Sequence, residues 1–438
     1  MLLEFRAENF RSFRDELVLD LRATASSELG SVVRTPAGLE ASARGVVPVI
    51  AVFGANASGK TSLFWAADFM CTAVLLSASS TTEGKGVLET VTTFHFDPSH
   101  REGPVTFRVT FLDEQVRHEY GFVLQPRKQA DRLTRVTSEW LRSWPKGHPR
   151  DVFLRGDVAA AAGHTSRWWV SEDGFRGGRR LGADLLEQTR DDVLFLSVAS
   201  QRNQQQCKSV VSWFSESFLT GAVDLRSGAG TAALMHSDDR FSRYVTGLMR
   251  AADTGIDEVS TTRLKGGYVS IDAPHLSRSE VTYRTKTLHR DASGQRVGLE
   301  LEQESHGTQR LFALAGPIYE VLRHGRCLWI DELDTGMHHW LVRVLVKMFQ
   351  SPETNPNGAQ LIFSTHDAAL MDPSLLRRDQ LWIVEKDAAQ GSQLYSLVDV
   401  EDKPRKDQPL FKAFLSGRFG GVPQLDEQTI LAWPREPE

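Results

Sequence analysis

The sequence predicts an α/β protein whose central sheet is assembled from both ends of the chain, with a large insertion between the two parts. An apolar run at residues 46–53 leads into a glycine-rich loop and then a helical pattern, which is typical of a central strand buried on both faces. Apolar strands and helical patterns alternate again over residues 297–363. The stretch between these regions lacks such alternation, so we expect one α/β domain that is divided in sequence.

Length and composition limit the class of protein. The chain has 438 residues, of which 41% are hydrophobic and 24% charged, as in a globular protein of one large domain or two to three ordinary ones. Its net charge of −5 argues against coating nucleic acid through an overall positive field, so any DNA contact must be local. Cys71, Cys207 and Cys327 have no C-x-x-C spacing, which favours buried thiols over a zinc site or a disulfide framework.

The sequence carries no recognisable targeting segment. Charge appears already at Glu4, too early for the apolar core of a signal peptide. No uninterrupted apolar run approaches the roughly 18 residues that are needed to cross a membrane. We therefore expect a soluble, cytoplasmic protein without a membrane partner.

The N-terminal part is expected to consist of strands around one helix. Strands are predicted at residues 2–5, 16–21 and 46–53, and the last of them ends in the glycine-rich loop. Residues 62–76 follow as a helix with an apolar side. Alternating patterns then predict a meander of strands at residues 92–96, 105–112 and 116–124.

A helical middle and a second α/β part follow. Apolar residues recur at helical spacing over 207–219, as in a helix that faces a core. These patterns divide the chain into an N-terminal lobe at 1–118, an insertion of α+β type at 119–295 and a C-terminal lobe at 296–438. Sustained heptads do not flank the insertion, so no long coiled coil is expected. In the C-terminal part, strands and helices are predicted to alternate at 297–303, 308–323, 327–330, 338–350 and 360–363.

The insertion contains the most basic stretch of the chain. Between residues 117 and 180 there are 13 lysines and arginines against 7 aspartates and glutamates, and Trp140, Trp144, Trp168 and Trp169 are interleaved. Such a stretch can contact DNA phosphates or an acidic partner protein, with base stacking as a minor contribution. It can equally be a solvated insertion whose tryptophans form its own core, and the sequence leaves both interpretations open.

The glycine-rich loop at residues 54–61 reads G-x-x-x-x-G-K-T, and it lies between a predicted strand and a predicted helix as a phosphate-binding loop requires. Its glycines let backbone N–H groups wrap the phosphates, Lys60 reaches the β/γ oxygens, and Thr61 ligates Mg²⁺. The Asn-Lys-x-Asp motif of GTP-binding proteins is not visible in the sequence, which favours ATP. The predicted nucleotide contacts here are Gly54, Ala55, Asn56, Ala57, Ser58, Gly59, Lys60, Thr61 and Ser62.

Two later strand ends carry residue types that complete such a site. The apolar run at 328–330 is followed by Asp331, which would orient Mg²⁺ through water, and by Glu332, which is placed to activate the attacking water as general base. The run at 361–364 leads to His366, a candidate contact to the γ-phosphate. Strands often end in acidic turns or histidines without any function. These residues therefore indicate a nucleotide site only in combination with the glycine-rich loop.

Ser305 and Gly307 precede the predicted helix at 308–323. The free N–H groups of a helix N-terminus favour a phosphate anion, so both residues are candidate nucleotide contacts. Taken alone, Ser305 is simply a good N-cap.

The order of these motifs resembles that of ABC-type ATPases. The loop stands where that family has Walker A, residues 305–309 stand at its signature, 328–332 at Walker B, and His366 at the switch histidine. The signature reads Ser-His-Gly-Thr-Gln here, where transporters have Leu-Ser-Gly-Gly-Gln.

Other segments resemble AAA15-type ATPases within that superfamily, which are related to OLD-family proteins and to RecF/SMC heads. They are Asn9-Phe-Arg-Ser-Phe13, residues 330–338, Ser364-Thr-His-Asp367 and residues 415–423. The resemblance covers nearly the whole chain except parts of the insertion.

The resemblance implies an ABC-type P-loop head that hydrolyses ATP with Mg²⁺ at a subunit interface. Ser305 and Gly307 of one subunit would close on the nucleotide that Lys60 of another subunit holds, and hydrolysis would reopen the pair. Arg11 and Ser12 are, by position, candidate contacts to adenine. The resemblance therefore makes the chain its own partner, in a dimer or a higher oligomer.

The resemblance also implies a separate effector protein. OLD-family nucleases carry a TOPRIM domain after the ATPase, whereas only about seventy residues follow His366 here, so we expect no nuclease centre in this chain. ATPases of this kind resemble components of bacterial two-gene anti-phage systems. Those are PARIS-like or paired with RloB- or AbiL-like partners, and a separate protein carries the toxic activity.

Three functions remain open from the sequence. The first is a sensor and regulator of a separate effector in anti-phage defence. The second is a RecF/SMC-like ATPase for DNA repair or DNA clamping, whose DNA binding would depend on Arg132, Arg135 or Arg179. The third is a scaffold that bound ATP locks together without hydrolysis.

Overall fold

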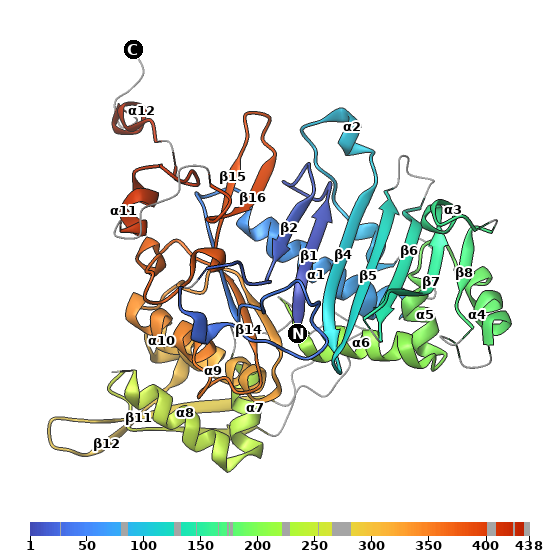
Figure 1. Cartoon of the computed structure of the whole chain (residues 1–438). Helices are drawn as coiled ribbons and strands as arrows, with labels where there is room; N and C mark the ends of the chain where they lie inside the picture. Colours follow the sequence, from blue (N-terminus) through green and yellow to red (C-terminus); the bar gives the residue numbers. More distant parts are fainter. Residues whose placement is uncertain are drawn as a thin grey trace.

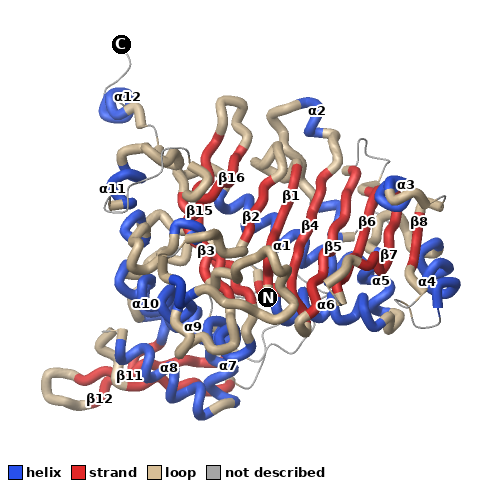
Figure 2. Tube along the Cα trace, in the orientation of Figure 1, coloured by secondary structure: helices blue, strands red, loops and turns tan. Residues whose placement is uncertain are grey.

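The described part of the chain forms three β-sheets with helices packed against them (Figures 1 and 2). This computed structural model describes residues 1–26, 28–79, 86–126, 133–145, 147–164, 166–172, 175, 178–220, 228–252, 254–264, 282–400, 409–423 and 425–432. The strands are β1 (Leu2–Glu8), β2 (Leu17–Asp20), β3 (Val49–Phe53), β4 (Val105–Asp113), β5 (Val116–Gln125), β6 (Arg135–Trp144), β7 (Arg150–Gly156), β8 (Trp168–Val170), β9 (Phe218–Leu219), β10 (Glu258–Arg263), β11 (Tyr283–Arg290), β12 (Arg296–Glu300), β13 (Cys327–Ile330), β14 (Gln360–Ser364), β15 (Leu381–Lys386) and β16 (Ser392–Ser396). The helices are α1 (Lys60–Leu76), α2 (Pro98–Arg101), α3 (Asp157–Ala161), α4 (Gly178–Glu187), α5 (Phe195–Gln201), α6 (Gln205–Ser217), α7 (Ala229–Ser237), α8 (Asp239–Ala251), α9 (His306–His324), α10 (His339–Gln350), α11 (Leu410–Leu415) and α12 (Glu427–Ala432).

The central sheet has the strand order β16-β15-β3-β14-β13-β9, and only β16 runs antiparallel to its neighbour. β3 lies between β15 and β14, so a strand from the start of the chain pairs with two strands from its end. Every residue of β3, β13 and β14 is buried, which explains their mainly apolar sequences. The predicted α/β fold that is divided in sequence is therefore confirmed.

Successive residues of β3 point into two different hydrophobic cores, because side chains alternate across a strand. Ile50 and Val52 pack in a core that contains α1, α6 and residues of the antiparallel sheet. Val49, Ala51 and Phe53 pack in a second core with α9 and α10. The phosphate loop that follows β3 is thereby anchored from both sides.

Helix α1 connects the two large sheets. Its Phe69 stacks on Phe107 of β4 with ring centroids 5.1 Å apart, and its Phe64 meets Trp329 of β13 edge to face at 5.7 Å. Residues Lys60–Ser79 have the length and apolarity of a membrane span, but more than half of this segment is buried inside the protein. The contacts identify α1 as a core helix.

The antiparallel sheet has the order β2-β1-β4-β5-β6-β7-β8. Strands β6 to β8 lie in the basic stretch, where the sequence predicted no elements. The expected boundary between residues 118 and 119 falls inside β5, which pairs with β4 from Val116 to Leu124. The early part of the insertion thus continues the N-terminal sheet (Figure 2).

The strand expected at residues 92–96 is not formed. Instead, the Arg11 N–H donates to Thr92 O at 2.9 Å, and the Phe94 N–H donates to Asn9 Oδ1 at 3.2 Å. This backbone therefore bonds to the Asn9–Phe13 turn rather than to a neighbouring strand.

A small antiparallel sheet of β10, β11 and β12 completes the fold beside α7 and α8. The strand predicted at 297–303 corresponds to β12, which ends at Glu300 before a 3₁₀ turn. The longest helix among the described residues is α9, with 19 residues, so this part of the protein contains no long coiled-coil arm.

Candidate functional site

The phosphate loop at residues 54–61 joins the carboxyl end of β3 to the first turn of α1. Gly54 and Gly59 have φ angles of 155° and 117°, which residues with a side chain rarely adopt. A Cβ on Gly54 would lie 2.3 Å from the Val384 carbonyl oxygen, and a Cβ on Gly59 would lie 2.2 Å from Ser392 Oγ. Backbone geometry and close packing therefore both require glycine at these two positions.

Lys60 is a buried cation within this loop. Its ammonium donates to Gly54 O at 2.8 Å and to Ala55 O at 3.0 Å. Burial lowers the pKa of Lys60 from its ordinary value, and the carboxylates that follow β13 partly oppose this shift. Because the ammonium is poorly solvated, an anion that binds here interacts with it more strongly than it would in water.

Serines from distant segments surround the loop. The Ser392 hydroxyl donates to Ser58 O at 2.6 Å, and the Ser392 N–H donates to Ser12 O at 2.7 Å. Ser12 Oγ would lie 2.7 Å from a Cβ placed on Gly59. The hydroxyl oxygens of Ser12 and Ser58 are buried and have no hydrogen-bond partner among the described residues. Buried polar atoms of this kind are expected where a polar ligand binds.

The carboxyl ends of β13 and β14 lie beside the end of β3 because these strands are parallel neighbours. Asp331 follows β13 and accepts a hydrogen bond from Ser364 Oγ at 2.5 Å, and the same hydroxyl accepts one from Glu332 N–H at 2.7 Å. Ser364 is fully buried at the end of β14. One serine thus holds the Asp331 carboxylate and the Glu332 backbone together.

Glu332 lies at the surface of the site. Its φ of 52° is left-handed, its side chain is exposed, and its carboxylate accepts from Thr335 Oγ1 at 3.1 Å. His366 is also exposed, and its N–H donates to Asp334 Oδ2 at 3.2 Å. The general-base candidate and the switch-histidine candidate therefore share one rim, linked through the turn after β13.

The Asn9–Phe13 turn lies against the start of α1. Arg11 has a φ of 53°, and its guanidinium carbon lies 3.2 Å from the ring centroid of Trp65, which is 45% exposed. Burial lowers the pKa of Arg11 from its ordinary value. Asn9 fixes this turn by donating from Nδ2 to His100 O and Pro104 O at 2.8 and 3.0 Å. Arg11 and Trp65 thus form a partly exposed cation–π pair, about one helical turn after the phosphate loop.

The start of α9 packs against the turn after β13. Ser305 caps the helix and accepts from Thr308 N–H at 3.2 Å. Gly307 packs on the turn after β13, where a Cβ would lie 2.4 Å from Gly336 O. Within the described residues, no hydrogen bond joins Ser305 or Gly307 to residues 54–61. Ser305 is exposed and Gly307 is half-buried.

The C-terminal segment at residues 415–423 packs behind the phosphate loop. The Gly421 N–H donates to Glu385 Oε2 at 3.0 Å, and Tyr395 donates its hydroxyl to Phe419 O at 2.8 Å. A Cβ on Gly421 would lie only 3.5 Å from Gly54 Cα. This segment therefore supports the loop from the side of β15 and β16.

The residues of the site fit a nucleotide with its metal. The loop N–H groups, the Lys60 ammonium and the unpartnered serine hydroxyls are donors for phosphate oxygens, while Thr61 and Asp331 offer the oxygen ligands that Mg²⁺ prefers. No cage of three or more His, Cys, Asp or Glu side chains occurs in the described part of the chain. Mg²⁺ needs none, because it keeps water and phosphate oxygens in its shell.

Three residues of this region were missed as site residues by sequence reasoning. Ser364 had a local signal, since it ends the strand that leads to His366. Ser392 had none, because it lies 334 positions from its partner Ser58. Trp65 was hidden among the apolar residues of α1.

Comparisons with known proteins found one family model and several solved structures. Residues 49–372 match the protein family described as "AAA domain, putative AbiEii toxin, Type IV TA system". A solved structure titled "Crystal structure of the SmcHead bound to the C-winged helix domain of ScpA" is similar at 13% identity and a TM-score of 0.40, over 90% of this chain and 97% of that one. The SMC head domain from Thermotoga maritima is similar at 13% identity and a TM-score of 0.36, over 90% and 98% of the two chains. No curated protein matches the sequence.

Proposed function

The chain belongs to the AAA-domain family that matches residues 49–372, and we propose that it hydrolyses ATP with Mg²⁺, oligomerises through shared ATP sites, and regulates a separate effector in anti-phage defence. We further propose that it acts in the cytoplasm. The observation that supports hydrolysis best is the common edge of β3, β14 and β13, from which the phosphate loop, His366 and the Asp331–Glu332 pair extend.

Each residue has a distinct task in this proposal. Lys60 holds the β- and γ-phosphate oxygens and Thr61 and Asp331 hold Mg²⁺, which supplies charge neutralisation to the phosphates. Glu332 accepts a proton from the attacking water, a role that suits an exposed carboxylate at the rim of the site. His366 contacts the γ-phosphate from the neighbouring strand end.

Turnover of Mg-ATP by purified protein tests the enzymatic part. We expect Lys60→Ala to abolish nucleotide binding, and Glu332→Gln to bind ATP but turn it over about 10²–10⁴-fold more slowly. Equal rates for the wild type and both variants would refute hydrolysis at this site. Nucleotide-dependent assembly without turnover, unaffected by Glu332→Gln, would instead support the scaffold function.

A mixing experiment tests the shared site. Ser305→Asp and Lys60→Ala proteins would each be inactive, because each damages one half of every composite site. When the two are mixed and dimerise at random, one site of each mixed dimer is intact, so about a quarter of wild-type turnover should return. No recovery on mixing, with each variant folded, would refute composite sites formed with Ser305.

The effector and the defence role have a separate test. The family description names a putative toxin of a type IV TA system, which supports a role of this chain in a two-gene system of this kind. We expect native complexes purified with ATP to contain a second protein, either a nuclease with a TOPRIM domain or an RloB-like protein, that Lys60→Ala fails to retain. Co-purification of the same protein by wild type and variant would argue against regulation by ATP.

DNA clamping is the second candidate, and it is favoured by Arg179, which is exposed beside the last strand of the antiparallel sheet and forms no ion pair with the residues that the structure describes. It predicts turnover that duplex DNA stimulates and binding that weakens with salt. Arg135→Glu and Arg179→Glu should abolish the stimulation, while Arg132 lies outside the described residues. Turnover indifferent to DNA would remove this candidate.

A further inference from the structure

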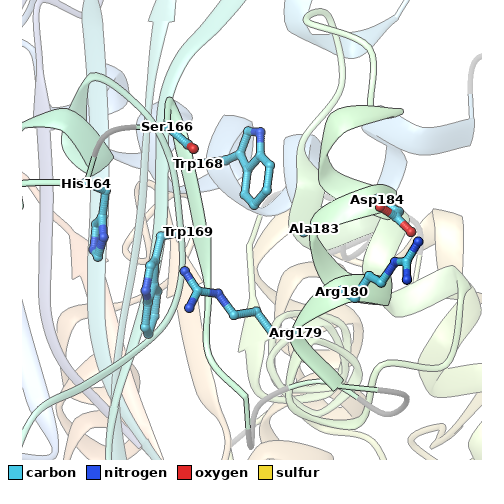
Figure 3. A pocket seen from close by; sticks show the side chains of 8 residues that line it. All are labelled: His164, Ser166, Trp168, Trp169, Arg179, Arg180, Ala183 and Asp184. Atoms are coloured by element: carbon cyan, nitrogen blue, oxygen red, sulfur yellow. The ribbon is translucent and has the colours of Figure 1, made fainter.

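A pocket of about 440 Å³ lies at the outer edge of the antiparallel sheet, between β8 and α4. This volume is within the range of about 300–1,000 Å³ that is usual for small-molecule sites. Figure 3 shows its walls: Trp168 and Trp169 come from β8, and Arg179 and Arg180 come from the first turn of α4. None of these residues belongs to the phosphate-loop site.

Aromatic side chains give the pocket flat walls. Both tryptophans are half-buried, so each indole is held in place yet keeps accessible surface. The His164 ring stacks on Trp169 with centroids 5.3 Å apart and planes inclined by 23°, which fixes the orientation of this indole. The Arg179 side chain extends from α4 toward Trp169 (Figure 3). A planar ligand would find a fixed ring and a guanidinium in one place.

The pocket also holds positive charge that forms no ion pair within the described residues. Other arginines of the basic stretch form ion pairs: Arg142 pairs with Asp151, and Arg155 pairs with the buried Glu139. Arg179 and Arg180 are exposed and form no ion pair within the described residues. Asp184 is the single acidic residue among the described residues that line the pocket. The described lining of the pocket thus has two arginines against one aspartate, and Asp184 follows Arg180 by one turn of α4.

Two further hollows continue the pocket along β8. One, of about 320 Å³, shares Trp168 with the pocket and is also lined by Arg167. The other, also of about 320 Å³, shares Trp169 and Arg179 and is also lined by Arg150. An extended ligand can thus follow the sheet edge past both indoles.

We infer that this edge of the antiparallel sheet binds unpaired nucleotides of a single-stranded nucleic acid. A base stacks in the pocket against Trp169 or Trp168, and Arg179 and Arg180 bind the adjoining phosphates. Stacking needs an open base face, which a duplex hides, so paired DNA is a poor ligand. The site is separate from the ATP site and does not depend on the function proposed for it.

Fluorescence anisotropy with labelled oligo(dT) and oligo(rU) of about 12 nucleotides tests this inference. We expect Trp169→Ala to weaken binding about 5- to 100-fold, as the loss of one stacked base does, and Trp169→Phe to restore most of it. Arg179→Glu should weaken binding and also flatten its dependence on salt. The matched control is Arg243→Glu, a charge reversal at an exposed arginine of α8, which should bind like the wild type.

Competitors identify the ligand. Thymidine monophosphate that displaces the probe as well as the oligonucleotide does would indicate a free nucleotide, and much weaker displacement would indicate a strand. In both cases a base stacks on an indole of the pocket, so both results agree with the inferred binding mode. The inference is wrong if the wild type binds neither probe at low salt, or if duplex DNA or polyglutamate competes as well as oligo(dT). It is also wrong if Arg179→Glu and Trp169→Ala, with unchanged ATP binding and melting temperature, bind like the wild type.

Discussion

Replacing Ser364 with alanine tests how far the acidic edge of the site depends on one hydroxyl. The hydroxyl is fully buried, donates to Asp331 Oδ1 at 2.5 Å, and accepts from Glu332 N–H at 2.7 Å. A hydrogen bond to a charged group contributes about 1.5–3 kcal/mol, and groups that support a metal ligand typically change metal affinity about 10- to 100-fold. Since Asp331 itself remains partly accessible to water, we take the lower part of the energy range. The half-saturating Mg²⁺ concentration should rise about 10- to 30-fold, which corresponds to ~1.4–2 kcal/mol.

The assay is ATP turnover titrated with Mg²⁺ at constant ATP. Turnover at saturating Mg²⁺ should fall less than the apparent Mg²⁺ affinity does, because Lys60 and the phosphate loop are intact. The matched control is Ser197→Ala in α5, which removes a buried serine that donates to Val74 O at 2.7 Å, in the core behind α1. That variant should lose stability without any change in Mg²⁺ dependence.

Two results would refute this reasoning. One is a Mg²⁺ titration of Ser364→Ala that overlays the wild type while thermal melting shows a folded protein. The other is an equal shift for Ser364→Ala and Ser197→Ala, because a general loss of stability would then explain both.

Three further predictions concern the loop and the core. Glu139→Ala should lower the free energy of unfolding by about 3–5 kcal/mol, because it leaves the buried Arg155 guanidinium with only the exposed Asp191 carboxylate and removes the acceptor for the first N–H groups of α5; a urea titration that gives a change under about 1 kcal/mol would contradict this. Burial lowers the pKa of His118 to about 4, from 6.5, so the unfolded chain binds more protons between these values. The free energy of unfolding should therefore fall by up to about 3 kcal/mol as pH drops through this window. Urea titrations at several pH values check this, and His118→Gln should lose this part of the pH dependence. An unchanged pH dependence in His118→Gln would show that the assignment is wrong. Gly59→Ala should reduce ATP affinity by at least about tenfold, because its Cβ would meet Ser392 Oγ and its φ is unsuited to alanine. Gly230→Ala, whose Cβ meets nothing within 4 Å, should bind ATP normally in the same fluorescence titration.

The parallel sheet was predictable because its strands obey a simple physical rule. Strands buried on both faces are mainly apolar, and β3 and β13 therefore stand out in the sequence. β6 did not stand out, since Ser138, Glu139 and Ser143 are polar yet buried and break the alternation of polar and apolar residues. A buried carboxylate is tolerated there only because its partners come from α5 and β7.

Within each motif of the site, the functional residues are close together in the sequence, so local spacing was enough to predict them. The residues around them come from elsewhere in the chain. Nothing near Ser392 or Trp65 indicates that they lie beside the loop, because pairing of β15 with β3 and the turn at Arg11 bring them there. The roles of Ser305 and Gly307 remain predictions, since they concern contacts between two subunits.

The position of β3 has a consequence for the protein during its synthesis. β3 pairs only with β14 and β15 in the described structure, and Ser392 is 334 positions from the loop residue that it contacts. At about 5–20 residues per second, a ribosome needs roughly 17–67 s to cover that distance. Until then the emerging loop lacks its neighbouring strands, so a nascent chain gains a complete nucleotide site only after β14, β15 and Ser392 have been synthesised.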